Sequence, residues 1–418
     1  MTSTQDADVL IVGAGVAGAT LALALASGGL KPLLIDRAPM SDQWEPTFDG
    51  RAWAIAYSAF RQWKVLGAGE HLESHAQRIE QILVTDGRRP GAAARGGPTP
   101  FGLRFDSGEI EDRSDGEPLG YMLENRRVRL GMAQALKSAK IDILAPARIV
   151  QTDFSGAAAR LTLDDGRVLS APAAVAADGR GSAMRRAAGI GVVGWPYGQC
   201  GVVATVALER PHHGVAHEYF LPSGPFAILP LTENRASLVW TESNRAAQAL
   251  MAASPEAFQA HLDRRFGDFL GAVRVLDGRF NYPLSMELAE RIAISRLALV
   301  GDAAHGIHPI AGQGLNLGLK DVAALAQVLV EARRLGEDIG SALVLERYAQ
   351  WRRFDSVTLA AGTDAFVRLF SNDNPLLRLA RGVGMSAVGA IGPARRFFMQ
   401  EAGGAVGDLP RLLRGEAL

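Results

Sequence analysis

Residues 9–18 have the sequence VLIVGAGVAG, and this stretch decides the fold of the first part of the chain. Its first four residues, Val9–Val12, form a continuous apolar run, which is typical of a strand buried on both faces of a sheet. Residues 19–26, ATLALALA, contain no helix breaker and predict a helix packed against that sheet. Residues 32–36, PLLID, predict a second buried strand that ends in an acid. The segment is therefore expected to form a strand–helix–strand unit with a glycine-rich first turn.

The glycine turn has the spacing of a dinucleotide-binding fingerprint. Gly13 allows the tight turn, Gly15 lets the backbone approach a pyrophosphate, and Gly18 lets the helix pack close to the strand. The helix N-terminus offers N–H groups and a partial positive charge to phosphates. Asp36 stands where an acid can accept hydrogen bonds from ribose hydroxyls. The pattern predicts dinucleotide binding without separating NAD from FAD, and its alternative is an ordinary glycine-rich turn.

A second stretch, residues 301–321, has the sequence GDAAHGIHPIAGQGLNLGLKD. Asp302 follows the buried strand predicted from Leu297, so its carboxylate can reach the hydroxyls of a ligand. Gly312 and Gly314 expose backbone at the start of a long helix, whose positive end can stabilise negative charge on a flat heterocycle such as reduced flavin. The simpler interpretation of Asp302 alone is a helix cap.

Composition excludes several classes of function. The 44 basic and 44 acidic residues cancel, so no global field attracts nucleic acid, and nucleic-acid binding is not expected. The single cysteine allows no disulfide within the chain, which fits a reducing compartment. We find no secretory signal and no run of eighteen apolar residues, so the cytoplasm is the expected location.

These motifs occur in the order found in class A flavoprotein monooxygenases, the superfamily of para-hydroxybenzoate hydroxylase, which the chain resembles over nearly its whole length. In that superfamily, a motif like Gly301-Asp302 contacts the ribitol and pyrophosphate of FAD. A motif like residues 178–182, DGRGS, touches FAD and also serves the passing nicotinamide cofactor. The resemblance implies FAD as cofactor, with NADH or NADPH as co-substrate.

A narrower resemblance points to the ubiquinone-biosynthesis hydroxylases. It is carried by residues 49–55, DGRAWAI, by residues 124–126, ENR, by the whole 301–321 stretch, and by Tyr348 with residues 352–355, RRFD. In such enzymes an arginine like Arg51 and one of the pair Arg126-Arg127 lie near the FAD phosphates. The pattern does not decide between Arg126 and Arg127, and a surface ion pair is the ordinary alternative for Arg51.

The candidate site residues follow from the fingerprint and the resemblance. The cofactor-binding candidates are Gly13, Gly15, Ala17, Gly18, Asp36, Arg37, Arg51, Arg126, Arg127, Asp178, Gly301, Asp302, Pro309, Gly312, Gly314, Leu315 and Asn316. The flavin-lining candidates are Pro309, Gly312, Gln313 and Gly314, and the substrate-cavity candidates are Phe220, Gly224 and Pro225. No side chain is identified as an acid–base catalyst. His305 and His308 have no further ligands that would complete a metal site and are expected to be structural.

The expected fold class is α/β, with a parallel-sheet, Rossmann-like FAD-binding domain, an inserted antiparallel-sheet substrate domain and a helical C-terminal region. Short alternating strands are predicted over 202–240, a surface loop over Gly87–Pro100, a long helix from Leu315 to about Leu335, and a helical region from about Pro375 to Leu413. The FAD-binding domain is assigned to 1–74, 118–187 and 288–365, the substrate domain to 75–117 and 188–287, and the helical region to 366–418.

The resemblance implies an aromatic-ring hydroxylase that uses NAD(P)H and oxygen through a flavin C4a-hydroperoxide. Its substrate would be a prenylated phenol of ubiquinone biosynthesis. Three alternatives stay open: a flavin-dependent reductase of isoprenoid double bonds, a plain NAD-dependent dehydrogenase, and a non-catalytic FAD-binding scaffold in a complex of quinone-biosynthesis enzymes.

The end of the chain could mediate contact with a membrane. Residues 366–418 carry seven arginines and four acidic residues around apolar turns. A basic amphipathic segment of this kind either lies on an anionic membrane surface or packs on the FAD-binding domain with its arginines in solvent. The first interpretation would place the protein peripherally at the inner face of a membrane.

Overall fold

Strands from three distant parts of the sequence pair side by side in one six-stranded sheet of the computed structural model, which describes residues 7–44, 47–88, 96–109, 116–276, 278–308, 312–370, 403–404 and 407–418. In spatial order, the strands are β19 (Ala293–Ile294), β20 (Leu297–Leu299), β12 (Ala173–Ala176), β1 (Val9–Val12), β2 (Pro32–Ile35) and β8 (Asp142–Leu144). All neighbours are parallel except β19 and β20. The chain leaves β1 toward β2 on one side, and β12 lies on the other. Ligands of such sheets bind at the carboxyl ends of the strands, where the strand order reverses.

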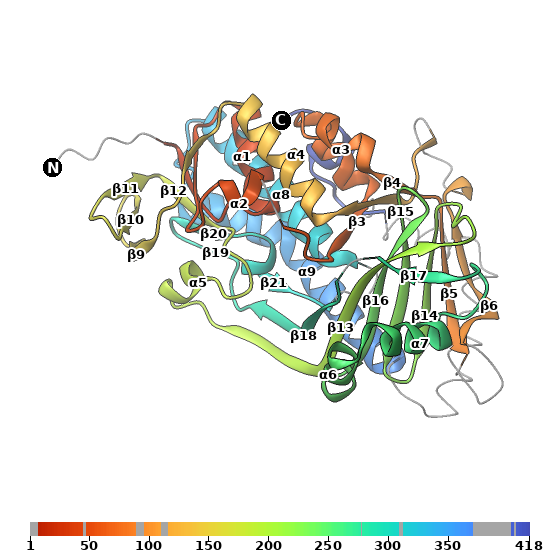
Figure 1. Ribbon diagram of the computed structural model, residues 1–418. Coiled ribbons are helices and arrows are strands. Elements are labelled where there is room, and N and C mark those ends of the chain that lie inside the picture. Colours follow the sequence, from red (N-terminus) through yellow and green to blue (C-terminus); the bar gives the residue numbers. More distant parts are fainter. Residues whose placement is uncertain are drawn as a thin grey trace.

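Both faces of this sheet are covered, which explains its continuous apolar strands. Figure 1 shows α1 (Val16–Ser27), α4 (Asn125–Ser138) and α8 (Gln313–Arg334) on one side and the small sheet of β9 (Ile149–Asp153), β10 (Ala159–Leu163) and β11 (Val168–Ala171) on the other. Alternate residues of β1 follow this division. Val9 and Ile11 pack among the helices, and Leu10 packs on the β9–β11 side.

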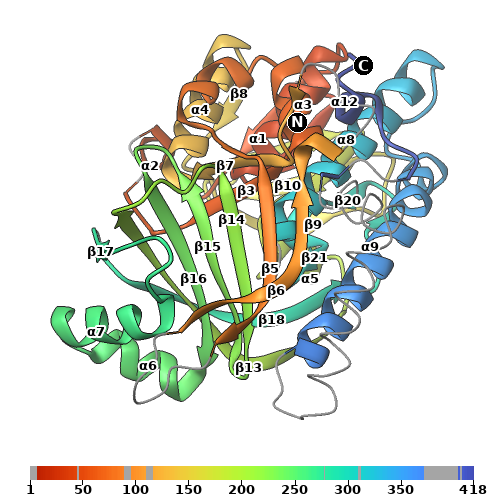
Figure 2. The same ribbon diagram turned by 90° about the vertical axis from the view of Figure 1, so that its right-hand side faces the viewer.

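The second large sheet is nine-stranded and mostly antiparallel. Its strands are β5 (Gln81–Arg88), β6 (Gly97–Asp106), β13 (Val192–Leu208), β14 (Val215–Leu221), β15 (Gly224–Leu231), β16 (Arg235–Ser243), β17 (Val273–Val275), β18 (Phe280–Ala289) and β21 (His305–Gly306). Figure 2 shows α6 (Asn244–Ala252) and α7 (Pro255–Phe266) on one side of it and α9 (Ala342–Phe370) on the other. The chain passes from the first sheet to the second twice, from β12 to β13 and from β20 to β21.

A third sheet lies between the two larger ones. It consists of β3 (Ala52–Ala56), β7 (Gly120–Glu124) and β4 (Gln77–Ile79), all antiparallel. Helix α3 (Tyr57–Val65) follows β3 directly, and the short helix α12 (Arg411–Arg414) packs on α3.

The structure confirms the predicted α/β fold class with its parallel and antiparallel parts. The first strand–helix–strand unit and the helix before Gly336 lie where the sequence predicts them. The domain boundaries proposed above stay a prediction. No helix within the described ranges is long and apolar enough to cross a membrane.

Two local predictions are wrong. The expected surface loop Gly87–Pro100 is strand at both ends, because β5 extends to Arg88 and β6 begins at Gly97. Glycine fits at position 87 because the Leu221 side chain lies where a Cβ would be. Strand β6 tolerates its prolines because it is the last strand of the sheet. Strand β13 begins ten residues before the predicted start at 202, since its first part is exposed and lacks an alternating pattern. Most of the predicted helical region after Pro375 lies outside the described residues.

Candidate functional site

The glycine turn after β1 is shaped by close packing. Gly13 has φ +109°, and a Cβ there would collide with the carbonyl oxygen of Ala177. A Cβ at Gly18 would collide with the carbonyl of Gly13, so both positions require glycine. Gly15 differs, since no described atom lies within 4 Å of where its Cβ would be. Its open side matches the predicted approach of a pyrophosphate.

The N-terminus of α1 is available to an anion. Gly15 is the N-cap, no described side chain caps the helix, and its first turn contains no acid. Asp36 holds the neighbouring turn, because its carboxylate accepts the N–H groups of Ala14 at 2.6 Å and Ala38 at 2.8 Å. Arg37 beside it is exposed. The ribose-binding role of Asp36 stays a prediction.

The loop after β12 reaches the same place. Asp178 Oδ2 accepts the N–H groups of Ala183 at 2.8 Å and Met184 at 3.3 Å. Its Oδ1 is buried and has no hydrogen-bond partner among the described residues, so it can accept a hydrogen bond from a bound molecule. Arg185 fastens this loop to the next segment by donating to the carbonyls of Arg180 and Ala303, both at 2.8 Å.

The Gly301-Asp302 turn lies beside the Gly13 turn and the loop after β12, and the place where these three segments meet is called the crevice below. Gly301 has φ +61°, and its Cβ position is 3.4 Å from the Cβ of Ala17 in α1. Asp302 is about half exposed, and its Oδ2 lies 3.5 Å from Nε of Arg180. Arg180 also donates to the carbonyl of Ile307 at 3.1 Å. The stretches around Gly13, Asp178 and Asp302 therefore converge, as the resemblance implies.

Helix α8 begins beside the third sheet. Its N-cap Gly312 has φ +65°, and its Cβ position is 3.0 Å from the Cβ of Ala54 in β3. The Asn316 amide accepts the N–H of Ala56 and donates to the carbonyl of Ala54, both at 2.9 Å. Asn316 therefore positions the helix start, and direct contact with the cofactor stays a prediction for it.

The other flavin-lining candidates are Gln313, Gly314 and Pro309, and Leu315 is a cofactor-binding candidate next to them in the sequence. Gln313, Gly314 and Leu315 form the first turn of α8 and are half-buried. Pro309 lies outside the described residues.

The predicted arginines lie at the edge of the third sheet. Arg51 is bound to Asp49, with Nε at 2.8 Å from Oδ2. Arg126 pairs with Glu124 at 3.2 Å, and β3 and β7 bring that acid opposite Ala52. Arg126 therefore lies at the same end of the third sheet as Arg51.

Arg127 lies near His75. The pKa of His75 lies below its ordinary value, first because His75 is partly buried and second because the Arg127 guanidinium is near. The geometry favours Arg126 over Arg127 as the partner of Arg51, and contact of these arginines with phosphate stays a prediction.

A buried polar cluster behind the Gly301 turn was missed in the sequence. Asp321 of α8 lies 2.9 Å from both His305 Nε2 and Arg352 Nε, and all three side chains are buried. The available signal was an acid inside the apolar stretch of a helix. His308 is also buried. Burial first, and Arg180 second, lower its pKa to about 4, so it is neutral at pH 7.

The substrate-cavity candidates lie on the second sheet. Phe220 of β14 pairs with Pro225 of β15, and Gly224 at the hairpin has φ +131°. Phe220 points away from the α7 side, since its neighbours Tyr219 and Leu221 pack on that side. The hairpin therefore directs Phe220 toward the face that α9 contacts through β15.

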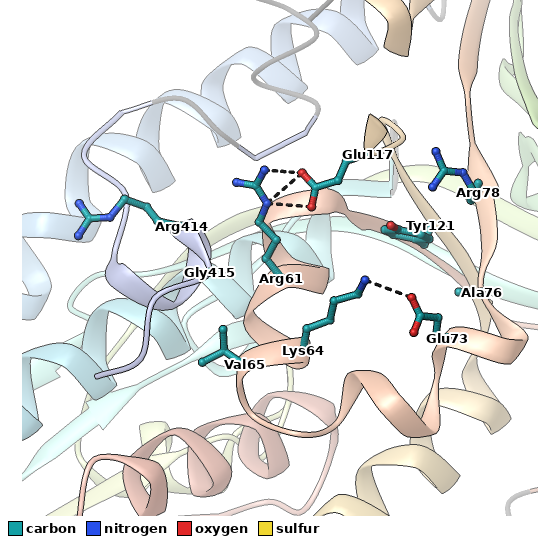
Figure 3. A pocket seen from close by; sticks show the side chains of 10 residues that line it. All are labelled: Arg61, Lys64, Val65, Glu73, Ala76, Arg78, Glu117, Tyr121, Arg414 and Gly415. Carbon is teal, nitrogen blue, oxygen red and sulfur yellow. Dashed lines mark hydrogen bonds and ion pairs between the residues drawn. The ribbon is translucent and has the colours of Figure 1, made fainter. Parts of the chain in front are cut away.

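A separate cavity of about 620 Å³ lies between α3, β7 and the C-terminal residues (Figure 3). Charged side chains dominate its lining, and they pair with each other: Arg61 with Glu117, and Lys64 with Glu73 at 3.1 Å. Tyr121 also lines it. An apolar ring or tail is poorly suited to such a lining, so the crevice is the better candidate site.

Comparison with known proteins agrees with this geometry. Residues 6–354 match the family described as FAD binding domain. Ubiquinone hydroxylase UbiL of Rhodospirillum rubrum is 45% identical, covering 100% of this chain and 95% of its own. The 3-demethoxyubiquinol 3-hydroxylase of Escherichia coli is 34% identical, covering 94% and 97%. The crystal structure of p-nitrophenol 4-monooxygenase PnpA from Pseudomonas putida has a TM-score of 0.77 at 19% identity, covering 94% and 97%, which shows a shared fold.

Proposed function

The chain belongs to the FAD binding domain family, among the flavoprotein monooxygenases that include the ubiquinone hydroxylases, and from this premise we propose that it hydroxylates an aromatic ring in ubiquinone biosynthesis. The substrate would be a polyprenylated phenol, and NAD(P)H and oxygen would be the co-substrates. The observation that carries the proposal is the convergence of the Gly13, Asp178 and Gly301 segments on one crevice.

The residues of the crevice fit FAD. The uncapped N-terminus of α1 would face the pyrophosphate, since N–H groups and the helix dipole favour negative charge there. Asp302 and the buried Oδ1 of Asp178 would accept hydrogen bonds from hydroxyl groups. The start of α8 at Gly312 would lie near the flavin ring and stabilise negative charge on it. FAD bound there would supply the chemistry, taking a hydride from NAD(P)H and activating oxygen for transfer to the ring.

The protein's own contribution is to bind, orient and exclude water. Arg180 spans the two large sheets, because it contacts Asp302 on one side and donates to Ser285 of β18 at 3.1 Å on the other. It therefore fixes the crevice relative to the second sheet. Phe220 and Pro225 would offer apolar surface to the ring or to its tail. The membrane contact expected of residues 366–418 remains part of this proposal, as does association with other quinone-biosynthesis enzymes.

The test is an assay of the purified protein with FAD, NADH or NADPH, ¹⁸O₂ and a short-chain prenylated phenol. The proposal predicts one ¹⁸O atom in the ring of the product, found by mass spectrometry, and NAD(P)H oxidation that depends on the phenol. A protein that binds FAD but adds two hydrogens to the prenyl chain is a reductase. A protein that binds FAD and oxidises no NAD(P)H with any phenol is a scaffold, and either result contradicts the proposal.

A further inference from the structure

The turn that carries Asp302 is supported by a fully buried carboxylate. Asp321 Oδ2 accepts the N–H of Gly301 at 3.1 Å, and Oδ1 accepts the Nε–H of Arg352 at 2.9 Å. Nε2 of His305 lies 2.9 Å from Oδ2. One carboxylate therefore faces nitrogen groups from the turn, from β21 and from α9.

The packing of α8 and α9 brings this carboxylate to the turn. Gly318 and Asp321 are three residues apart and lie on the same face of α8. A Cβ at Gly318 would be 2.9 Å from the Cα of Gly301, so only glycine lets the helix come this close. On α9, Tyr348 donates its hydroxyl to the carbonyl of Leu299 at 2.7 Å. Both helices thus hold the end of β20.

The cluster keeps its charges. Burial alone would raise the pKa of Asp321, but the nearby His305 and Arg352 outweigh burial and lower that pKa below its usual value. Burial likewise opposes the charge of Arg352, and Asp321 outweighs it and raises the arginine pKa. Arg352 donates to Asp355 as well, at 2.7 Å. The Gly301 N–H is therefore held by a charged acceptor.

We propose that Asp321 is a positioning residue for flavin binding, because its carboxylate fixes the Gly301 peptide so that Asp302 projects into the crevice. The inference rests on the proposed role of Asp302 as an FAD ligand. Gly301 lies against Ala17 at the start of α1, so a shift of this peptide moves Asp302 relative to the pyrophosphate site. An amide cannot replace the carboxylate. Asparagine has one acceptor oxygen and a donor nitrogen, so either Gly301 or Arg352 would lose its acceptor.

The first experiment compares two substitutions at opposite ends of β20. Asp321→Asn is expected to raise the Kd for FAD by about tenfold or more, measured by quenching of flavin fluorescence on titration into apoprotein. The matched control is Asp338→Asn, which breaks the Arg296–Asp338 ion pair before β20. That pair makes no contact with Gly301, so the Kd is expected to change by less than about twofold.

A second variant separates positioning from folding. The double substitution Asp321→Leu with Arg352→Met removes both charges and fills their volume, which commonly preserves or raises stability. The Gly301 N–H still loses its acceptor. We therefore expect a thermal midpoint of the apoprotein near that of the wild type, together with an FAD Kd that stays about tenfold or more weaker.

The outcomes are distinguishable. Wild-type FAD affinity in the double variant, which leaves Gly301 without this acceptor, would overturn the positioning role while leaving the flavin proposal intact. A wild-type protein that binds no FAD would overturn the proposed function itself, and this inference with it. Loss of FAD affinity in the double variant with an unchanged thermal midpoint is the result that supports positioning.

Discussion

The back and the open side of the crevice are formed by different kinds of residue. At the back, Gly13 and Gly18 have no room for a side chain, and Asp321 is fully buried. On the open side, Gly15 faces space without a described neighbour, and Asp302 is about half exposed. The difference indicates that packing and buried charge pairs stabilise the conformation at the back. The residues of the open side are instead available to contact a ligand. Substitutions at the two places should therefore separate stability from FAD affinity.

The largest effect is expected at the back of the crevice. Asp321→Asn should lower the free energy of unfolding of the apoprotein by roughly 3–5 kcal/mol, because Arg352 stays buried without its main counter-charge. Asp338→Asn should cost less, roughly 1–2 kcal/mol, because Asp338 is half exposed although its partner Arg296 is mostly buried. Urea unfolding followed by circular dichroism measures both. Equal losses in the two variants would show that the buried ion pair of Asp321 stabilises the fold no more than the half-exposed pair of Asp338.

Two glycines of the first turn, Gly13 and Gly15, give a second comparison between the back and the open side. Gly13→Ala should cost roughly 1–3 kcal/mol of stability, since the residue has φ +109° and faces the Ala177 carbonyl. Gly15→Ala should change stability by less than about 0.5 kcal/mol, because φ there is −67° and its Cβ meets no described atom. It should instead weaken FAD binding. An unaffected Kd in Gly15→Ala would show that this open space does not receive the cofactor.

Stability should fall as the pH drops below neutrality. The pKa of His308 is about 4 in the folded protein and about 6.5 when unfolded, so the unfolded chain binds the extra proton first. The stability is complete above pH 6.5 and is lost as the pH falls toward 4, by roughly 2 kcal/mol between pH 7 and 5.

Two leucine variants measure this pH dependence. His308→Leu should reduce the loss by roughly 2 kcal/mol. His217→Leu in the second sheet should do the same, since burial also lowers the pKa of His217 to about 4. An unchanged slope in His308→Leu would mean that solvent reaches His308 in the folded protein.

The smallest effect on folding is expected on the open side. Asp302→Ala should alter apoprotein stability by less than about 0.5 kcal/mol, because its 3.5 Å pair with Arg180 is exposed on both sides. It should nevertheless raise the FAD Kd by about tenfold, through lost hydrogen bonds to the cofactor. Stability and flavin titrations on one preparation test both statements. A large loss of stability in Asp302→Ala would show that Asp302 stabilises the fold and not only the bound cofactor.

Local sequence predicts the glycine turn better than the Asp321 cluster. The glycine spacing of this turn can be read from neighbours in the chain, although the Ala177 carbonyl that packs against Gly13 comes from the loop after β12. The bond between Asp321 and Arg352 joins residues 31 apart on two helices, so only the packing of those helices reveals it. The preference for Arg126 over Arg127 likewise depends on the register of β3 and β7.

The second sheet shows the same limit. Its alternating strands were predicted from residue 202 onward, where most side chains of β13 are buried. The first part of β13, from Val192, is exposed and pairs with β18, which lies some ninety residues later in the sequence. An alternating pattern arises only where one face is buried, so this part gave no signal.

Hydrogen–deuterium exchange with and without FAD tests the central claim most directly, that separate stretches hold one cofactor. The account predicts simultaneous protection on FAD binding at residues 13–18, at 178–184, at 301–302 and in the first turn of α8. The β14–β15 hairpin should exchange as before. Protection confined to residues 13–18, with no change at Asp178 and Asp302, would contradict the account.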